Sequence, residues 1–366
     1  MRILHWTESF HPRIGGMEVF VRHLVEHQIS QGHRCQIITG ALPDQSEFDD
    51  SLGYTITRLH FQRSLIARSL VGIMKIQQKV DTLVADFSPD LLHLHTSQAS
   101  AFFYTRARNL PKALYTAHDG LLETIHTSSS LLEKILSSVV SVVAPSDFVA
   151  TKLRQLFPTA EQKIERVYGS LPCAIFADRQ TDFPSTPYHL LAMGRLIPEK
   201  GFDVFLRAVA RVHKSFPNMK VTISGDGPEA ESLRGLAATL ALDNTVHFTG
   251  WTQPEAISDL IAAAAIVVVP SLWQEPFGLV ALQAMQQGRP VIASRVGGLQ
   301  DIVEERTGYL VPPGDDDALA DAIIALLNSP EQLSTWGRNA ALLAATKFAW
   351  SDCVDAYQRL YEDMTR

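Results

Sequence analysis

The sequence contains few cysteines. Three occur among 366 residues, Cys35, Cys173 and Cys353, and no two of them have the spacing of a metal site. An odd, scattered set is typical of proteins that fold without disulfides in a reducing compartment, so we expect a cytoplasmic protein. We expect each cysteine to serve as a small, buried apolar residue.

Long apolar runs are also missing. The longest, residues 260–269, stops at Pro270, whereas a membrane-spanning helix needs about 20 apolar residues. The N-terminus has no apolar segment of the length found in signal peptides, and the acid Glu8 follows soon after Met1. We therefore expect neither a membrane span nor a secretion signal.

Positive charge is in deficit. The net charge is −7 and the pI about 6.0, which argues against nucleic acid as a partner. Residues 63–79 are the exception, with Arg63, Arg68, Lys75 and Lys79 among apolar residues. A basic amphipathic helix of this kind either lies on a membrane or is an ordinary solvated helix, and both interpretations stay open. The first would place the protein at the inner face of the membrane.

Short apolar runs alternate with helical periods along the chain, which predicts an α/β protein with parallel sheets. The length favours two domains. The first series contains an apolar strand at residues 2–6, a Gly15-Gly16 loop and a helix at residues 17–31. A second series follows residues 169–187, which are rich in glycine, serine and proline and are predicted to be the linker.

Residues 270–298 form the most informative unit. A strand ends at Pro270, a loop carries Glu275, and a helix over residues 279–287 leads into another strand. Open parallel sheets bind ligands at the carboxyl ends of their strands, where this loop lies. The unpaired N–H groups of a helix start favour phosphate, so an acid beside them predicts chemistry on a phosphorylated substrate.

Two more loops of the second half are candidates for ligand binding. Arg195 and Lys200 share one strand-to-helix loop, and two cations there suit a diphosphate. Gly225 and Gly227 begin a G-x-G-x-x-A pattern, with Asp243 about where a dinucleotide site has its ribose acid. The pattern follows a complete βα unit instead of opening its domain, so we do not expect a nicotinamide or flavin cofactor.

The first half offers glycines and histidines. Gly15 and Gly16, between a strand and a helix, permit close backbone approach to a ligand. His118 follows a strand end, where an imidazole can bond a sugar hydroxyl or a phosphate. His93 and His95 face the same side of one strand, but no third ligand has matching spacing. We expect structural roles for these two and no metal site.

Together these segments resemble the retaining glycosyltransferases of family 4, which have the GT-B architecture. The resemblance covers nearly the whole chain. It rests on the order and spacing of short motifs: Gly15-Gly16, Gly32-His33, His93 and His95, Thr116-Ala117-His118, Gly194-Arg195-Leu196, Glu199-Lys200-Gly201, Gly225-Asp226-Gly227-Pro228, Glu275-Pro276-Phe277-Gly278, Gly297-Gly298, and Gly308 to Asp315.

The resemblance implies two Rossmann-like, parallel-sheet domains facing across a cleft. Residues 1–175 would form the acceptor-side domain, and residues 186–349 would bind the nucleotide sugar. The helix at residues 350–366 would pack back on the first domain. Family members move a sugar from a nucleotide-diphosphate donor to an acceptor with retention, and they need no metal or other cofactor.

The resemblance implies a role for each residue of this sequence that matches a motif position of the family. Arg195 and Lys200 match the residues that hold the diphosphate, and Glu275 matches the first acid of the E-x7-E motif. His118 matches a histidine that contacts the sugar. The remaining positions expected to bind substrate are Gly15, Gly16, Gly225, Gly227, Pro276, Phe277, Gly278, Leu279 and Gln283.

Two departures stand out. Gln283 occupies the second acidic position of E-x7-E, which loses a charge toward the nucleotide ribose and predicts weaker or altered nucleotide recognition. Residues 168–172 replace the family's usual Asn-Gly-Val-Asp. A nucleotide-sugar-binding protein without turnover and a GT-B epimerase or phosphorylase are the alternatives. The sequence does not specify the donor, the oligomeric state or the acceptor, whether glycan, lipid-linked or small molecule.

Overall fold

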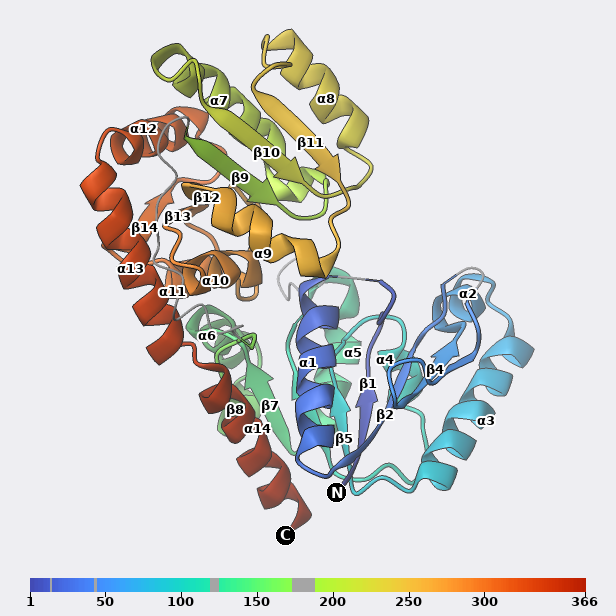
Figure 1. Cartoon of the computed structure of the whole chain (residues 1–366). Helices are drawn as coiled ribbons and strands as arrows, with labels where there is room; N and C mark the ends of the chain where they lie inside the picture. The colour runs from blue at the N-terminus through green and yellow to red at the C-terminus, as the bar shows by residue number, and fades with distance from the viewer. Residues whose placement is uncertain (14, 43–44, 119–124, 173–187) are drawn as a thin grey trace. The chain divides into compact units, whose positions relative to one another are not determined.

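The computed structural model describes residues 1–13, 15–42, 45–118, 125–172 and 188–366, without the side chains of residues 125–130 (Figure 1). The chain divides into two compact units. Unit 1 contains residues 1–169 and 351–366, and unit 2 contains residues 170–350. Most of the predicted linker, residues 173–187 with Cys173, lies outside the described residues, as do Asp119 and Gly120.

Unit 1 is built on one sheet with the strand order β3-β4-β2-β1-β5-β6-β7-β8, in which only β3 runs antiparallel to its neighbour. Its strands are β1 (Arg2–Trp6), β2 (Arg34–Gly40), β3 (Phe48–Asp49), β4 (Thr55–Leu59), β5 (Leu91–Leu94), β6 (Ala113–Thr116), β7 (Ser141–Ala144) and β8 (Ile164–Arg166). Its helices are α1 (Gly16–Ser30), α2 (Phe61–Ile66), α3 (Leu70–Phe87), α4 (Ala101–Tyr104), α5 (Ile125–Ser138), α6 (Asp147–Leu156), the 3-10 helix η1 (Pro158–Lys163) and α14 (Trp350–Thr365).

Unit 2 has a parallel sheet with the order β11-β10-β9-β12-β13-β14. Its strands are β9 (His189–Met193), β10 (Lys220–Ser224), β11 (Val246–Gly250), β12 (Ile266–Val269), β13 (Val291–Ser294) and β14 (Gly308–Val311). Its helices are the 3-10 helix η2 (Pro198–Lys200), α7 (Phe202–Ser215), α8 (Ala230–Thr239), α9 (Pro254–Ala263), α10 (Leu279–Gln286), α11 (Leu299–Ile302), α12 (Asp316–Leu327) and α13 (Pro330–Thr346). The prediction of two parallel-sheet, Rossmann-like domains is confirmed.

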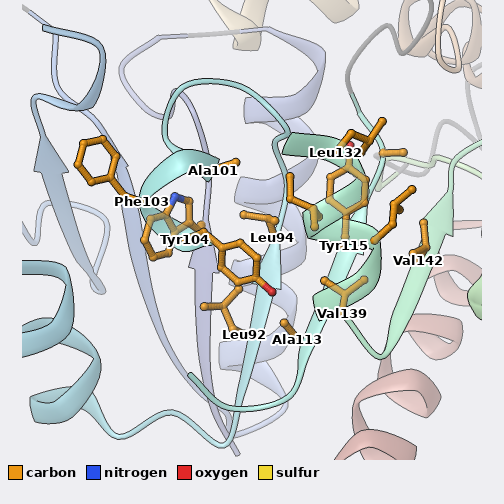
Figure 2. Packing of buried hydrophobic residues seen from close by; sticks show 14 of the residues in the cluster. Leu92, Leu94, Ala101, Phe103, Tyr104, Ala113, Tyr115, Leu132, Val139 and Val142 are labelled. Atoms are coloured by element: carbon orange, nitrogen blue, oxygen red, sulfur yellow. The ribbon is translucent and has the colours of Figure 1, made fainter. Parts of the chain in front are cut away.

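The two faces of the unit 1 sheet differ in chemistry. One face is an apolar core in which Leu92, Leu94 and Tyr115 pack with side chains of α4 and α5 (Figure 2). Because successive side chains of a strand point to opposite faces, His93 lies on the other side. There, Gln28 of α1 donates to Tyr361 of α14 over 2.9 Å, so the last helix packs on the first unit.

One predicted helix is divided in two. The basic helix expected over residues 63–79 is interrupted by residues 67–69, because Arg68 has a φ of +48° and Ser69 caps the start of α3.

Candidate functional site

The candidate site of unit 2 lies where its strand order reverses. The order β11-β10-β9-β12-β13-β14 corresponds to the 3-2-1-4-5-6 order of dinucleotide-binding folds, with the reversal between β9 and β12. The loop after β9 carries Arg195 and Lys200, and the loop after β12 carries Glu275. Topology therefore brings the two predicted loops to one edge of the sheet, at the position where such sheets bind ligands.

Lys200 and Glu275 meet directly. The Lys200 Nζ donates to Glu275 Oε1 over 2.5 Å, and Ser271 Oγ donates to the same oxygen over 2.6 Å. Glu275 is buried, and no hydrogen bond to its second oxygen, Oε2, comes from the described residues. The carboxylate is thus anchored at one oxygen and has the other available for a ligand hydroxyl.

The loops around this pair are held together by backbone contacts that only glycine permits. Gly225 has a φ of +147°, and a Cβ there would lie 1.8 Å from the carbonyl oxygen of Gly194. Gly297, with a φ of +49°, would place a Cβ 2.1 Å from the Glu275 carbonyl oxygen. These glycines therefore have a packing role, whereas ligand binding by Gly225 and Gly227 stays a prediction.

Helix α10 begins beside the acid. Gly278 precedes Leu279 with a φ of +122°, which favours glycine, and no side chain caps the helix start. The Gly298 N–H donates to the Glu275 carbonyl over 2.7 Å, while Phe277 packs against Phe348 with ring centroids 5.7 Å apart. The first-turn N–H groups of α10 thus lie close in sequence to the Glu275 carboxylate.

The side chains of Arg195 and Gln283 form no hydrogen bonds with the described part of the chain. The Arg195 side chain is exposed and makes no hydrogen bond or ion pair with the described part of the chain. Gln283 is half-buried on α10, and its side-chain amide has no hydrogen bond to another described residue. Within the described part of the chain, neither side chain is therefore held by a protein partner, and ligand binding by both residues stays a prediction.

Sequence reasoning missed three residues of the loop after β12. Ser271 bonds Glu275, and Gln274 accepts through Oε1 from the Gly297 N–H over 2.8 Å. Lys200 Nζ lies 5.0 Å from the centre of the Trp273 ring, whose indole N–H is buried with no partner in the described residues. Their only signal was proximity to Glu275 in the stretch Ser271-Leu272-Trp273-Gln274.

The candidate residue of unit 1, His118, ends a chain of hydrogen-bonded rings. His118 Nε2 lies 3.2 Å from His95 Nδ1, His95 Nε2 lies 3.0 Å from His5 Nδ1, and His5 Nε2 lies 2.8 Å from Gln28 Oε1. Burial lowers the pKa of His5 to about 4 and of His118 to about 3, and it lowers the pKa of His95 well below 6.5. All three rings are neutral near pH 7.

The expectation that no third potential metal ligand lies near His93 and His95 was wrong, because His5 lies beside them. Parallel pairing of β1 with β5 sets His5 beside His93, and one nitrogen of each of the three rings lies within 4.8 Å of the others. Sequence spacing could not reveal this, because β1 and β5 are far apart in the chain. His93 is bonded to Tyr361 and Thr116, both at 2.7 Å, so both nitrogens of every ring already have protein partners. The cluster is a hydrogen-bonded network.

Gly15 and Gly16 begin α1, as expected for that loop. The Glu18 carboxylate lies at this helix start and accepts a short hydrogen bond from Ser9 Oγ. A buried acid in the first turn is favourable toward the helix dipole, and Glu18 was not predicted as a site residue from the sequence. No helix in the described residues is both long and apolar enough to cross a bilayer.

Comparison with known proteins identifies the family. Residues 14–173 match the family described as Glycosyltransferase Family 4, and residues 175–342 match Glycosyl transferases group 1. The phosphatidyl-myo-inositol mannosyltransferase of Mycobacterium leprae is 28% identical over 95% of this chain and 93% of its own.

Two solved structures share the fold. The sucrose-phosphate synthase of Thermosynechococcus elongatus superposes with a TM-score of 0.82 at 24% identity, covering 99% of this chain and 98% of that one. The Anabaena protein Alr3699/HepE, solved with UDP-glucose, gives a TM-score of 0.78 at 21% identity over 99% and 100%. The chain is a GT-B glycosyltransferase that belongs to glycosyl transferases group 1 and glycosyltransferase family 4.

Proposed function

We propose that this enzyme transfers a hexosyl group from a nucleotide-diphosphate sugar to a hydroxyl acceptor with retention of configuration. The observation that carries the proposal is the Lys200–Glu275 pair at the strand-order reversal of unit 2. It sets a cation for a diphosphate beside a carboxylate for sugar hydroxyls. The uncapped start of α10 adds N–H donors to the same loop.

The chemistry follows from the charges that develop. The bond between the anomeric carbon and the diphosphate oxygen breaks, and negative charge grows on the leaving group. Arg195, Lys200 and the first N–H groups of α10 would stabilise that charge more strongly in the transition state than in the bound donor. The acceptor oxygen bonds the anomeric carbon on the face that the diphosphate leaves, and its proton passes to the diphosphate.

Glu275 is assigned to orienting the donor sugar. Its Oε1 is committed to Lys200 and Ser271, whereas Oε2 can accept from a sugar hydroxyl. His118 would contact the sugar. The cations already present would make a metal unnecessary, so we expect transfer to proceed unchanged with a chelator in excess.

Relatives support a nucleotide-sugar donor. One relative is named as a mannosyltransferase acting on phosphatidyl-myo-inositol, and a protein of the same fold has been solved with UDP-glucose. A thermal-shift panel of nucleoside diphosphates and their sugars identifies the donor, because stabilisation rises with ligand concentration relative to Kd.

The decisive experiment replaces Arg195 and Lys200 separately by alanine and measures kcat/KM with the identified donor. We expect each to lose roughly 10- to 1,000-fold, because each removes a charged contact to the leaving group. Lys214→Ala, an exposed lysine of unit 2, is the control and should match the wild type. Wild-type kcat/KM in both site variants would contradict the assignment. Donor binding without hydrolysis or transfer would indicate a binding protein instead.

A further inference from the structure

Unit 1 has an apolar surface where α2 meets α3. Ile66, Leu70, Val71 and Met74 are 75%, 77%, 65% and 71% exposed, and we call these four side chains the apolar patch. They lie within nine consecutive positions of the chain. Single exposed apolar residues are ordinary, but a contiguous group of large ones marks a surface that binds something.

The rest of α3 behaves as a normal surface helix. Ile76, Val80 and Val84 are buried against the sheet, while Gln78, Lys79 and Thr82 are exposed. The apolar exposure is therefore confined to the end of α2 and the start of α3. That turn is fixed by the left-handed Arg68 and by Ser69, whose Oγ accepts from the Gly72 N–H over 3.1 Å.

Positive charge surrounds the apolar patch. Residues 51–80 contain no aspartate or glutamate, although the whole chain has a net charge of −7. Arg63, Arg68 and Lys75 are exposed and form no ion pair with any described residue. Lys79, farther along the helix, is paired with Glu47 at 2.6 Å.

We propose that the apolar patch and its three free cations bind the surface of an anionic lipid bilayer. Insertion of large apolar side chains with basic residues at headgroup level is the pattern of interfacial helices. A second copy of the chain fits less well, because a symmetric contact would set Arg68 and Lys75 against the same cations of its partner. The proposal does not depend on the donor or on catalysis.

Vesicle sedimentation with the full chain tests the proposal. Vesicles of phosphatidylcholine alone are compared with vesicles containing a third phosphatidylglycerol. We expect the protein to bind the anionic vesicles at least about tenfold more tightly than the neutral ones. Arg68→Gln and Lys75→Gln should each lower the affinity for the anionic vesicles by about fivefold. Leu70→Ser with Met74→Ser should remove most of the remaining binding, while the transfer rate on a water-soluble acceptor stays unchanged.

Two exposed residues of unit 2 provide matched controls. Leu342→Ser removes an apolar side chain that is 65% exposed, and Lys214→Gln removes an exposed cation. Both should bind vesicles like the wild type. Failure of the wild type to bind anionic vesicles would overturn the proposal, as would equal losses in the controls. A dimer in analytical ultracentrifugation that Leu70→Ser dissociates would assign the patch to a second copy instead.

A second inference concerns the ring chain that ends at His118, and it rests on the proposed role of that residue. In a neutral imidazole one nitrogen donates and the other accepts. Because His118, His95 and His5 are joined nitrogen to nitrogen, the proton position on one ring fixes those on the others. The end of the chain at Gln28 therefore decides which nitrogen of His118 carries the hydrogen.

The orientation of the Gln28 amide sets which nitrogen of each histidine ring donates and which accepts. Its Nε2 donates to Tyr361 OH over 2.9 Å, and its Oε1 accepts from the Cys35 thiol over 3.4 Å. The same oxygen then accepts from His5 Nε2–H, which makes His5 Nδ1 the acceptor for His95 Nε2–H. His95 Nδ1 in turn accepts from His118 Nε2–H.

We infer that Gln28, His5 and His95 are positioning residues that hold His118 as the Nε2–H tautomer, with the Nδ1 lone pair offered as an acceptor. Such a ring accepts from a sugar hydroxyl and cannot donate through Nδ1 to a phosphate. The tautomer thus selects which part of a nucleotide sugar His118 can contact.

Nitrogen-15 NMR of labelled histidine reads the tautomer directly. We expect wild-type His118 to carry its proton on Nε2, and Gln28→Glu to preserve that state because a carboxylate only accepts. Gln28→Leu should lower the ratio of the two tautomers by about fivefold, the equivalent of one ordinary hydrogen bond. Gln358→Leu is the control, since Gln358 bonds His33, which is not one of the linked rings His118, His95 and His5.

The outcomes separate this inference from the proposed function. A wild-type His118 protonated on Nδ1, or a ratio unchanged by Gln28→Leu, would overturn it. If the NMR results are as expected and His118→Ala keeps wild-type kcat/KM, the ring chain stands and the contact between His118 and the sugar does not.

Discussion

At the scale of single residues, the candidate site depends on positions where adding, removing or charging one atom would change a contact. Glu275 has one oxygen committed and one available, and Gly225 has no room for a Cβ. Gln283 differs from the family's usual acid by one charged atom. Such positions give sharp predictions, because each substitution changes one contact.

Gly225→Ala is expected to destabilise unit 2. The added Cβ would lie 1.8 Å from the Gly194 carbonyl oxygen at a φ of +147°, so backbone must move and strain is added. We expect a loss of roughly 3 kcal/mol or more in the free energy of unfolding, measured by denaturant titration. Gly235→Ala, on α8 with nothing within 4 Å of the new atom, should instead gain about 0.5–1 kcal/mol. Equal stability of both variants would contradict the packing role.

Gln283→Glu is expected to tighten nucleotide binding. A charged acceptor bonds a ribose hydroxyl more strongly than an amide, by about 0.5–2 kcal/mol, or roughly 2- to 30-fold in Kd. Calorimetry with the nucleoside diphosphate measures the change. Gln155→Glu, at an exposed position of α6, adds the same charge and should have no effect. Unchanged affinity in Gln283→Glu would remove this residue from the ribose site.

At the scale of elements, α14 joins the two ends of the chain in one core. Its Tyr361 hydroxyl accepts from Gln28 on α1 and bonds His93 on β5, and its Tyr357 hydroxyl lies 3.1 Å from Thr116 Oγ1. The helix therefore completes the hydrogen bonding of a polar sheet face that would otherwise be buried unpaired.

Tyr361→Phe is expected to cost about 1–3 kcal/mol of stability. Loss of the hydroxyl leaves a Gln28 donor and a His93 nitrogen without partners in a buried setting. Thermal unfolding with a matched van't Hoff analysis measures the loss. Tyr309→Phe is the control, because its half-buried hydroxyl makes no hydrogen bond with the described residues, and it should change stability by less than about 0.5 kcal/mol. Unchanged stability of Tyr361→Phe would mean that the Tyr361 hydroxyl does not help to hold α14 on the sheet.

At the scale of the whole molecule, the buried histidines make unit 1 sensitive to acid. The pKa of His5 is about 4 and that of His118 about 3, while burial holds those of His93 and His95 well below 6.5. Unfolded histidines bind protons below about pH 6.5 and these folded ones do not, so the unfolded state gains protons as the pH falls.

Stability should therefore decrease between pH 6.5 and 4, with each histidine adding a slope that approaches about 1.4 kcal/mol per pH unit. The Asp49 carboxyl does not contribute there. Hydrogen bonds from Ser51 and Arg58 lower its pKa to about 2, so its contribution is lost only below about pH 3.8. Calorimetry in buffers of different ionisation enthalpy at pH 5.5 should detect uptake of several protons on unfolding. Uptake of fewer than about two would contradict neutral, buried rings.

Much of the fold could be predicted because its signals are local. Alternating apolar runs and helical periods gave the two parallel sheets, and glycines at strand ends gave the loops of unit 2. The break between α2 and α3 was missed, since a left-handed Arg68 has no signature in apolar periodicity. The helix α4 was missed because its four residues are too few to show a helical period.

The sequence by itself determined the candidate residues: Arg195, Lys200, Glu275 and His118 are recognisable from their motifs and their places after predicted strands. The tertiary structure alone decided how they are paired. Lys200 reaches Glu275, 75 residues away, because β9 and β12 are neighbours at the strand-order reversal. His5 joins His95, 90 residues away, because β1 pairs with β5 in one register. Strand order and register come from long-range burial and backbone pairing, which no local pattern encodes.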